Sequence, residues 1–320
     1  MRNFYTYILV CFCFLQMNQA LAQDPIFSQV QNSASVFNPA LTGAGVQKRV
    51  VRFKYRDANG GKGAVLNSVA FFNMEQKIKM ASGNDYFALG ANVLSEKIGG
   101  GLLVQNSTTL SGAYYNAMNE DGNNGLSAGL SITYGNKMLD MAQVKTQDMF
   151  GSFGFPSTTS LDPAAANYKS SYLYLNAGVG YNFKLNNNNL FHVGAALFRV
   201  NRPKDSKNGN SKMDSKLVFE SKYKKLINDD ESVELIANHQ MIANASITTV
   251  GAMYSKLLVD DVHLIELGLL HRVNYAIIPY VGIGINKAKF GLSYDVTMTQ
   301  YKNMLNSMPT IELTFSWDLN

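Results

Sequence analysis

The last thirty residues of the chain alternate between apolar and small or polar side chains. This period of two indicates β-strands, in which successive side chains point to opposite faces. Carboxylates at every second or third inward position are costly in the dry core of a sandwich, whereas a strand between lipid and a wet lumen accommodates them. The segments 289–298 and 310–319 therefore predict the closing hairpin of an outer-membrane β-barrel. In the second segment Ile311, Leu313, Phe315, Trp317 and Leu319 interleave with Glu312, Thr314, Ser316 and Asp318.

The same alternation recurs between turn signals along most of the chain. It predicts an all-β protein, a transmembrane antiparallel β-barrel of about fourteen strands. An even number of strands places both termini on the same side of the membrane, which in bacterial barrels is the periplasmic side. The expected strands are residues 46–56, 65–76, 86–97, 103–118, 126–138, 171–185, 190–200, 216–225, 232–242, 247–258, 262–273, 277–286, 288–298 and 310–319.

The lengths of the junctions support this count independently. We number the junctions between consecutive expected strands in chain order. All the long junctions then have odd numbers, and the even-numbered junctions are mostly short and rich in Asn, Asp and Gly. Bacterial barrels have short periplasmic turns and longer extracellular loops. We therefore expect the odd-numbered junctions outside the cell, including residues 57–64, 139–170, 201–215 and 299–309.

Residues 1–22 have the features of a secretory signal peptide, with Arg2, an apolar stretch and the ending Ala20-Leu21-Ala22. Both cysteines lie inside it, so a mature chain would have no disulfide and no thiolate chemistry. Residues 23–45 contain two prolines and no sustained alternation. We expect either a flexible leader or an N-terminal periplasmic segment that folds back as a plug, with the barrel formed by residues 46–320. Plug candidates are Asp24, Pro25, Phe27, Asn38 and Pro39.

Charged residues fall on one face of several expected strands. On the first strand Val51, Phe53 and Tyr55 are expected to face lipid, and the residues between them the lumen. Two interpretations remain open, an ion-pair network that fills a narrow barrel and a selective polar pathway. The residues expected in this lumenal network are Arg52, Lys54, Arg56, Glu234, Glu266, Arg272, Asp295 and Glu312, with Asp318 beside them.

Several functional classes lack a sequence signal. The net charge of +5 is mild and the basic residues are scattered, so no nucleic-acid partner is expected. The four histidines have no serine or carboxylate at a spacing that predicts a triad. No metal-type cluster, phosphate loop or acidic calcium repeat occurs, so we expect no enzyme, no metal and no cofactor.

Five short motifs resemble the PorP/SprF family of Bacteroidota outer-membrane proteins. They are residues 23–29, 37–43, 201–203, 291–297 and 311–316, and together they span almost the whole mature chain. The resemblance implies an outer-membrane barrel of type IX secretion and gliding motility. It implies a role in holding secreted adhesins at the surface, or in linking the outer membrane to periplasmic lipoproteins.

The expected function is therefore attachment or assembly of a secreted type IX cargo, with that adhesin, periplasmic lipoproteins or other secretion components, and outer-membrane lipid as partners. A passive porin for small solutes is the first alternative, and a barrel enzyme is the second. The junction 139–170 favours a docking role because its apolar cluster has little reason to be exposed on a porin loop, although folded inward it would only constrict the lumen. The cluster is Phe150, Phe153, Phe155 and Pro156.

Overall fold

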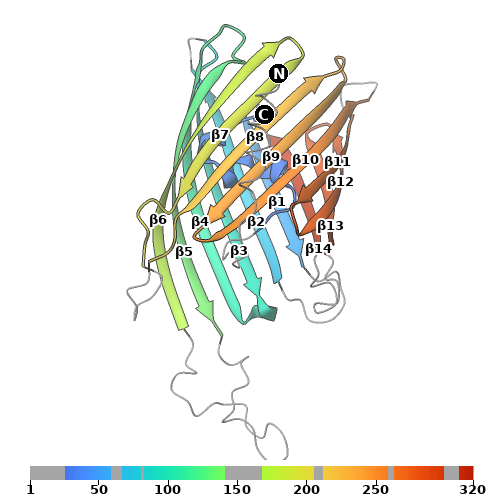
Figure 1. Ribbon diagram of the computed structural model, residues 1–320. Helices are drawn as coiled ribbons and strands as arrows, with labels where there is room; N and C mark the ends of the chain where they lie inside the picture. The colour runs from blue at the N-terminus through green and yellow to red at the C-terminus, as the bar shows by residue number, and fades with distance from the viewer. Residues whose placement is uncertain are drawn as a thin grey trace, which may run out of the picture.

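The protein is a closed β-barrel of fourteen antiparallel strands among its described residues. Each strand pairs with its neighbours in sequence, and β1 closes the wall by pairing with β14 (Figure 1). The predicted fold and strand number are both confirmed. The computed structural model describes residues 26–58, 67–80, 83–140, 168–204, 212–258, 263–298 and 310–319.

The strands follow the sequence alternation closely. They are β1 Arg49–Asp57, β2 Asn67–Lys79, β3 Tyr86–Ile98, β4 Leu103–Ala117, β5 Gly125–Leu139, β6 Tyr168–Asn186, β7 Asn189–Phe198, β8 Lys216–Leu226, β9 Glu231–Ile242, β10 Ala245–Leu257, β11 His263–Arg272, β12 Ala276–Ile285, β13 Ala288–Thr297 and β14 Thr310–Leu319. A single turn, η3 Gly99–Gly101, connects β3 to β4.

The two faces of the wall differ as the alternation predicts. Phe53 on β1 and Leu267 on β11 point outward and are 46% and 52% exposed. Lys54 and Arg272, on the same two strands, point inward and are 1% and 2% exposed. Outward apolar residues on a barrel wall form the surface that meets lipid. None of the helices within the described residues is long and apolar enough to cross a membrane.

The first strand begins three residues later than expected. The N–H groups of Ala44 and Val46 bond to Leu41 O and Gly43 O in successive turns, so this stretch cannot join the strand ladder. Gly43 has a φ of 75°, a left-handed conformation that glycine adopts without strain. The expected start of the barrel at residue 46 is therefore wrong, and Val46 is buried as part of the N-terminal segment.

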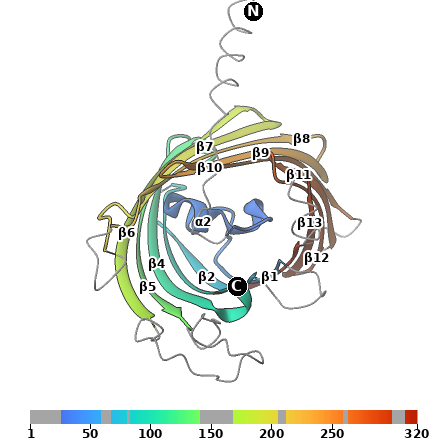
Figure 2. The same cartoon turned by 60° about the horizontal axis from the view of Figure 1, so that its bottom comes forward.

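The N-terminal segment, which we define as residues 26–46, lies inside the ring of strands (Figure 2). It forms three single turns: η1 Val30–Ser33, α2 Ala34–Phe37 and η2 Pro39–Leu41. Asn38 starts the last of these, because its side chain accepts the N–H of Ala40 and Pro39 needs no hydrogen-bond partner there. Phe27, Val30 and Phe37 join inward residues of the wall in the hydrophobic core, which therefore occupies the lumen.

The two ends of the barrel are distinct. We call the end where β1 begins and β14 finishes the short-turn end, and the opposite end the long-loop end. The junction at residues 187–188 belongs to the short-turn end. At the long-loop end β5 finishes at Leu139 and β6 begins at Tyr168.

Candidate functional site in the barrel lumen

Glu312 on β14 holds the beginning of the N-terminal segment. Its Oε2 accepts the backbone N–H of Ser28 at 2.6 Å, and its Oε1 accepts that of Gln29 at 3.0 Å. Lys54 Nζ lies 3.6 Å from the same carboxylate and donates to the carbonyl oxygen of Gln29 at 2.9 Å. Hydrogen bonds to an ionised acceptor are about twice as strong as neutral ones. Lys54 and Glu312 thus hold this stretch between the first and last strands.

A second buried ion pair lies beside this anchor. Arg272 Nη1 donates to Asp295 Oδ2 at 2.9 Å, and the Arg272 Nη2 lies 3.4 Å from the carbonyl oxygen of Phe27. Arg56 connects the two acidic side chains, 3.8 Å from Asp295 and 3.9 Å from Glu312. Because a buried charge must be paired, these five charged residues depend on one another.

On the opposite wall the segment is held through Asn38. Its Nδ2 donates to Glu220 Oε1 at 2.8 Å and to the carbonyl oxygen of Val179 at 3.0 Å. The wall at this point is made of glycine so that the segment can approach its backbone. A Cβ at Gly178 would overlap the side-chain amide of Asn38. A Cβ at Gly129 would overlap the backbone of Pro39 and Ala40. Only glycine fits these two inward positions.

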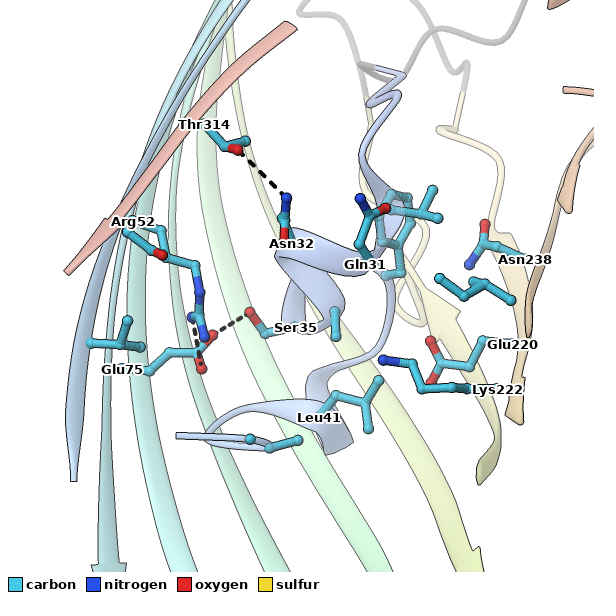
Figure 3. A pocket seen from close by; sticks show the side chains of 18 of the residues that line it. Gln31, Asn32, Ser35, Leu41, Arg52, Glu75, Glu220, Lys222, Asn238 and Thr314 are labelled. Carbon is cyan, nitrogen blue, oxygen red and sulfur yellow. Dashed lines mark hydrogen bonds and ion pairs between the residues drawn. The ribbon is translucent and has the colours of Figure 1, made fainter. Parts of the chain in front are cut away.

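The third anchor is Glu75 on β2. It accepts the backbone N–H of Gly43 at 3.0 Å and the hydroxyl of Ser35 at 2.5 Å. Arg52 lies 3.2 Å from the same carboxylate (Figure 3). The segment is therefore held at its start, its middle and its end by carboxylates from three separate parts of the wall.

The structure brings together five of the eight charged residues expected in one network. Those are Lys54, Arg56, Arg272, Asp295 and Glu312. The remaining three form separate pairs: Arg52 with Glu75, Glu234 with Lys222 at 3.1 Å, and Glu266 with Lys289 at 2.7 Å. Asp318 is exposed at the short-turn end.

Of the expected plug residues, Phe27, Asn38 and Pro39 are buried in the lumen. Asp24 and Pro25 lie outside the described residues, and so does the cluster of Phe150, Phe153, Phe155 and Pro156.

Two acidic anchors were missed by the sequence analysis, Glu75 and Glu220. Both occupy inward positions of alternating strands, so the signal that selected the other lumenal charges was also present here. The sequence contained no indication that these two carboxylates contact residues 35–43. That contact spans 182 positions between Asn38 and Glu220.

Two cavities flank the N-terminal segment, and Ser35 lines both. The first, of about 510 Å³, lies toward the short-turn end, and we call it the short-turn vestibule. Figure 3 shows Gln31 of the segment facing Glu220 and Lys222 across it. The second, of about 320 Å³, lies toward the long-loop end and is the long-loop vestibule. Phe27 and Val36 of the segment line its inner side.

The lumenal histidine His192 is held in a structural arrangement. Its Nδ1 lies 2.6 Å from Asn182 Oδ1 and its Nε2 3.4 Å from Glu220 Oε1. Within the described part of the chain, no three His, Cys, Asp or Glu side chains are grouped as metal ligands would be. The carboxylates of the lumen bind the chain's own N-terminal segment.

Comparison with solved structures gives outer-membrane barrels. A Pseudomonas aeruginosa FadL homologue is 11% identical with a TM-score of 0.53, over 90% of this chain and 94% of that chain. The P. putida toluene transporter TodX is 10% identical with a TM-score of 0.48, over 90% and 94%. Omp33 of Acinetobacter baumannii is 10% identical with a TM-score of 0.43, over 85% and 96%. At such identities the likeness concerns the fold alone.

Comparison at the sequence level gives one family. The family described as type IX secretion system membrane protein PorP/SprF matches residues 19–317. No curated protein matches the sequence.

Proposed function

Because this chain belongs to the PorP/SprF family of type IX secretion system membrane proteins, we propose that it is a closed attachment barrel. In this proposal it holds an exported protein, such as an adhesin, at the cell surface and links to secretion components or lipoproteins in the periplasm. The chain is an outer-membrane β-barrel. Its family is described as a membrane protein of the type IX secretion system, and we propose no catalytic role.

The occupied lumen is the observation that carries the proposal. A passive porin needs a continuous water-filled path, and its interior is accordingly polar and open. Here the N-terminal segment crosses the lumen and is held by carboxylates on β14, β8 and β2, of which those on β14 and β2 are buried. Breaking such buried contacts costs several kcal/mol each by order of magnitude. A wall closed in this way is suited to docking rather than to free diffusion of solutes.

Conductance in a planar bilayer tests the closed state. The intact protein should be almost silent, and a variant lacking residues 25–41 should conduct ions. A matched variant that lacks an equally long part of the junction 140–167 should stay silent, because it keeps the N-terminal segment. High conductance of the intact protein would reject the closed barrel and favour the porin alternative.

Recovery of partners tests attachment. Affinity isolation from native outer membrane should recover an exported protein together with the barrel. Replacing Phe150, Phe153 and Phe155 by Ser should reduce that recovery sharply, because buried aromatic residues often contribute about 2 kcal/mol or more each to an interface. Replacing Phe53, Phe290 and Phe315, which belong to β1, β13 and β14, is the matched control, since it removes three phenylalanines from the wall and leaves the loop unchanged. Undiminished recovery from the first variant would remove this loop from the proposal.

Orientation is tested by labelling whole cells with a membrane-impermeant maleimide. Cysteines placed at Gly154 and Asn208 should react, because we propose that the long-loop end faces outward. Cysteines at Asn188 and Asp230, in turns of the short-turn end, should not react. Labelling of the second pair instead would reverse the proposed direction.

A further inference from the structure

The short-turn vestibule has the size of a binding pocket and is closed at its inner end. Its volume of about 510 Å³ lies within the range of roughly 300–1,000 Å³ that is usual for ligand sites. Val30, Ala34 and Phe37 of the N-terminal segment line its inner side, whereas Gly45 and Asp318 line it near the short-turn end. A molecule that enters from that end therefore stops at the N-terminal segment.

Gln31 contributes an unpaired amide to this vestibule. Its Nε2 and Oε1 are both buried, and neither has a hydrogen-bond partner among the described residues. Figure 3 shows its side chain opposite the wall that carries Glu220, Lys222 and Asn238. A buried polar atom without a partner is unfavourable, because it has lost its hydrogen bonds to water. Gln31 therefore favours an occupant that supplies both an acceptor and a donor.

Apolar side chains line the same vestibule. Phe37 and Leu41 belong to the N-terminal segment, and Ile236 belongs to β9. Ligand sites commonly combine apolar walls, which bury the ligand, with a few polar groups, which orient it. An extended peptide suits both features, because each residue offers a backbone N–H and C=O together with a side chain.

Unpaired cations lie along one side of the mouth of the vestibule. Lys48 directly precedes β1, Arg49 begins it, Lys79 ends β2, and Lys287 lies in the turn between β12 and β13. We call these four exposed residues the basic arc. Within the described part of the chain, none of them forms an ion pair with a carboxylate.

Strand pairing makes the basic arc continuous. The N–H of Lys77 donates to the carbonyl oxygen of Lys48 at 2.8 Å, and the N–H of Asp318 donates to that of Lys287 at 2.9 Å. β1 and β14 are direct neighbours between these two contacts. Asp318 is the one acidic residue in the described ranges 47–50, 76–80, 286–289 and 317–319. The arc therefore has an excess of positive charge and favours an anionic partner.

The opposite side of the short-turn end differs. The turns between β4 and β5 and between β8 and β9 contain acidic residues, and two lysines beside them are paired. Lys184 lies 3.5 Å from Asp121, and Lys256 lies 2.7 Å from Glu231. Positive charge without acidic neighbours is thus a property of the basic arc and not of the whole short-turn end.

We propose that the short-turn vestibule binds an extended acidic segment of a partner protein, with its carboxylates on the basic arc and a backbone amide of its inner end at Gln31. An apolar side chain beside that amide packs against Phe37, Leu41 and Ile236. The inference rests on the proposed function, because a periplasmic secretion component or lipoprotein would supply the segment. It adds a site and a chemistry to the periplasmic link.

Fluorescence anisotropy with defined probes tests this. The probe is a fluorescein-labelled octapeptide of three Asp–Gly pairs followed by two Leu, titrated with the purified, folded, full-length barrel in detergent. One comparison probe is the same peptide with Lys in place of Asp. The other is an oligogalacturonate of similar charge, which has carboxylates but no amide. We expect saturable binding of the acidic peptide that weakens with rising salt, because salt screens exposed charges.

Replacing Lys48, Arg49 and Lys79 together by Gln should weaken binding of the acidic peptide about tenfold. Each exposed ion pair contributes little, but the change removes three of them. The salt dependence of the remaining binding should also become weaker. These residues are exposed and do not hold the N-terminal segment, so we expect the variant to fold.

Replacing Lys224, Lys225 and Lys256 together by Gln is the matched control. It removes the same number of positive charges from the short-turn end and leaves the basic arc unchanged. This variant should bind the acidic peptide as tightly as the unaltered barrel.

Gln31→Leu tests the inner end of the site. It should also weaken binding about tenfold, because the two hydrogen bonds to the segment are lost. Heat-modifiable migration on gels checks that the barrel is folded, and silence in a planar bilayer checks that the N-terminal segment is still docked. If Gln31→Leu does not pass these checks, the comparison of the two triple variants still decides the matter.

Absence of binding by the acidic peptide would overturn the inference, and so would equal affinities of the two triple variants. Equal binding of the Lys-containing peptide, or an unchanged affinity of a docked Gln31→Leu barrel, would overturn it as well. Tighter binding of the oligogalacturonate would replace it by an acidic saccharide. Each of these results leaves conductance and partner recovery untouched, so the inference can fail while the proposed attachment function stands.

Discussion

Replacing Glu312 by Gln should release the N-terminal segment from the wall. The substitution keeps the shape of the side chain but removes the charge that accepts the N–H groups of Ser28 and Gln29. Lys54, 1% exposed, would lose its counter-ion. Removing one partner of a buried pair costs about 3–5 kcal/mol. This cost falls on the docked state, because undocking opens the lumen around Lys54 to water.

The size of the effect follows from that cost. A change of about 1.4 kcal/mol is tenfold in an equilibrium constant, so the undocked population should rise by roughly two to three and a half powers of ten. The strand ladder consists of backbone hydrogen bonds that the substitution does not touch. The variant should therefore migrate as a folded, heat-modifiable barrel and yet show frequent conducting events in a planar bilayer.

Glu234→Gln is the control for charge removal inside the barrel. Glu234 pairs with Lys222 at partly exposed positions, and that pair does not hold the N-terminal segment. This variant should remain as silent as the unaltered protein. Adding Lys54→Met to Glu312→Gln should restore part of the closed state, because an apolar side chain removes the unpaired buried charge. A Glu312→Gln barrel that is folded and as silent as the Glu234→Gln barrel would refute this account of the anchor.

Three further predictions concern the wall. Gly129→Val should place a side chain against Pro39 and expel the segment without changing any charge, which bilayer conductance would detect; a silent, folded variant would contradict the close approach. Leu292→Arg should cost about 2–4 kcal/mol in urea unfolding if it lies near the bilayer midplane, whereas Ser316→Arg, which lines the short-turn vestibule, should cost much less. Asp85 lies in the turn between β2 and β3, where the N–H of Ala117 holds the pKa of its carboxyl below the usual value. Because that pKa is lowered by folding, the stability that Asp85 contributes is present above its unfolded pKa and is lost as the pH falls through its folded pKa. The deficit of Asp85→Asn in urea unfolding should therefore appear at neutral pH and vanish in strong acid; an equal deficit at both would exclude the charge as its cause.

The strands could be read from the sequence because the signal for them is local. The two faces of a barrel strand contact lipid and the lumen respectively. Every strand of about ten residues therefore alternates between apolar and polar side chains. The last strand was predicted at residues 310–319 and lies there. Some strand boundaries were predicted wrongly: β1 begins at Arg49 rather than at residue 46, because turns precede it, and β6 begins at Tyr168 rather than at residue 171. An alternating pattern does not say where hydrogen bonding to the neighbouring strand stops.

The charged residues that face the lumen could also be predicted, because the alternation of a strand assigns each of its side chains to one of the two faces. Their pairing could not be predicted. Lys54 meets Glu312 because β1 closes the barrel against β14, and Arg52 instead meets Glu75 on β2. Which charged residues form ion pairs across neighbouring strands depends on the register of those strands. That register is fixed only when the whole sheet has folded.

What fills the lumen was decided by tertiary structure alone. Residues 26–46 have no alternation and form three single turns that would not be stable in water by themselves. They are ordered because carboxylates from three parts of the wall take up their N–H and side-chain donors, and because Gly129 and Gly178 leave room for Asn38 and the two residues after it. A period-two sequence determines a wall between lipid and water by local physics, but the contents of the lumen depend on contacts between residues that lie far apart in the chain and meet only once the barrel has closed.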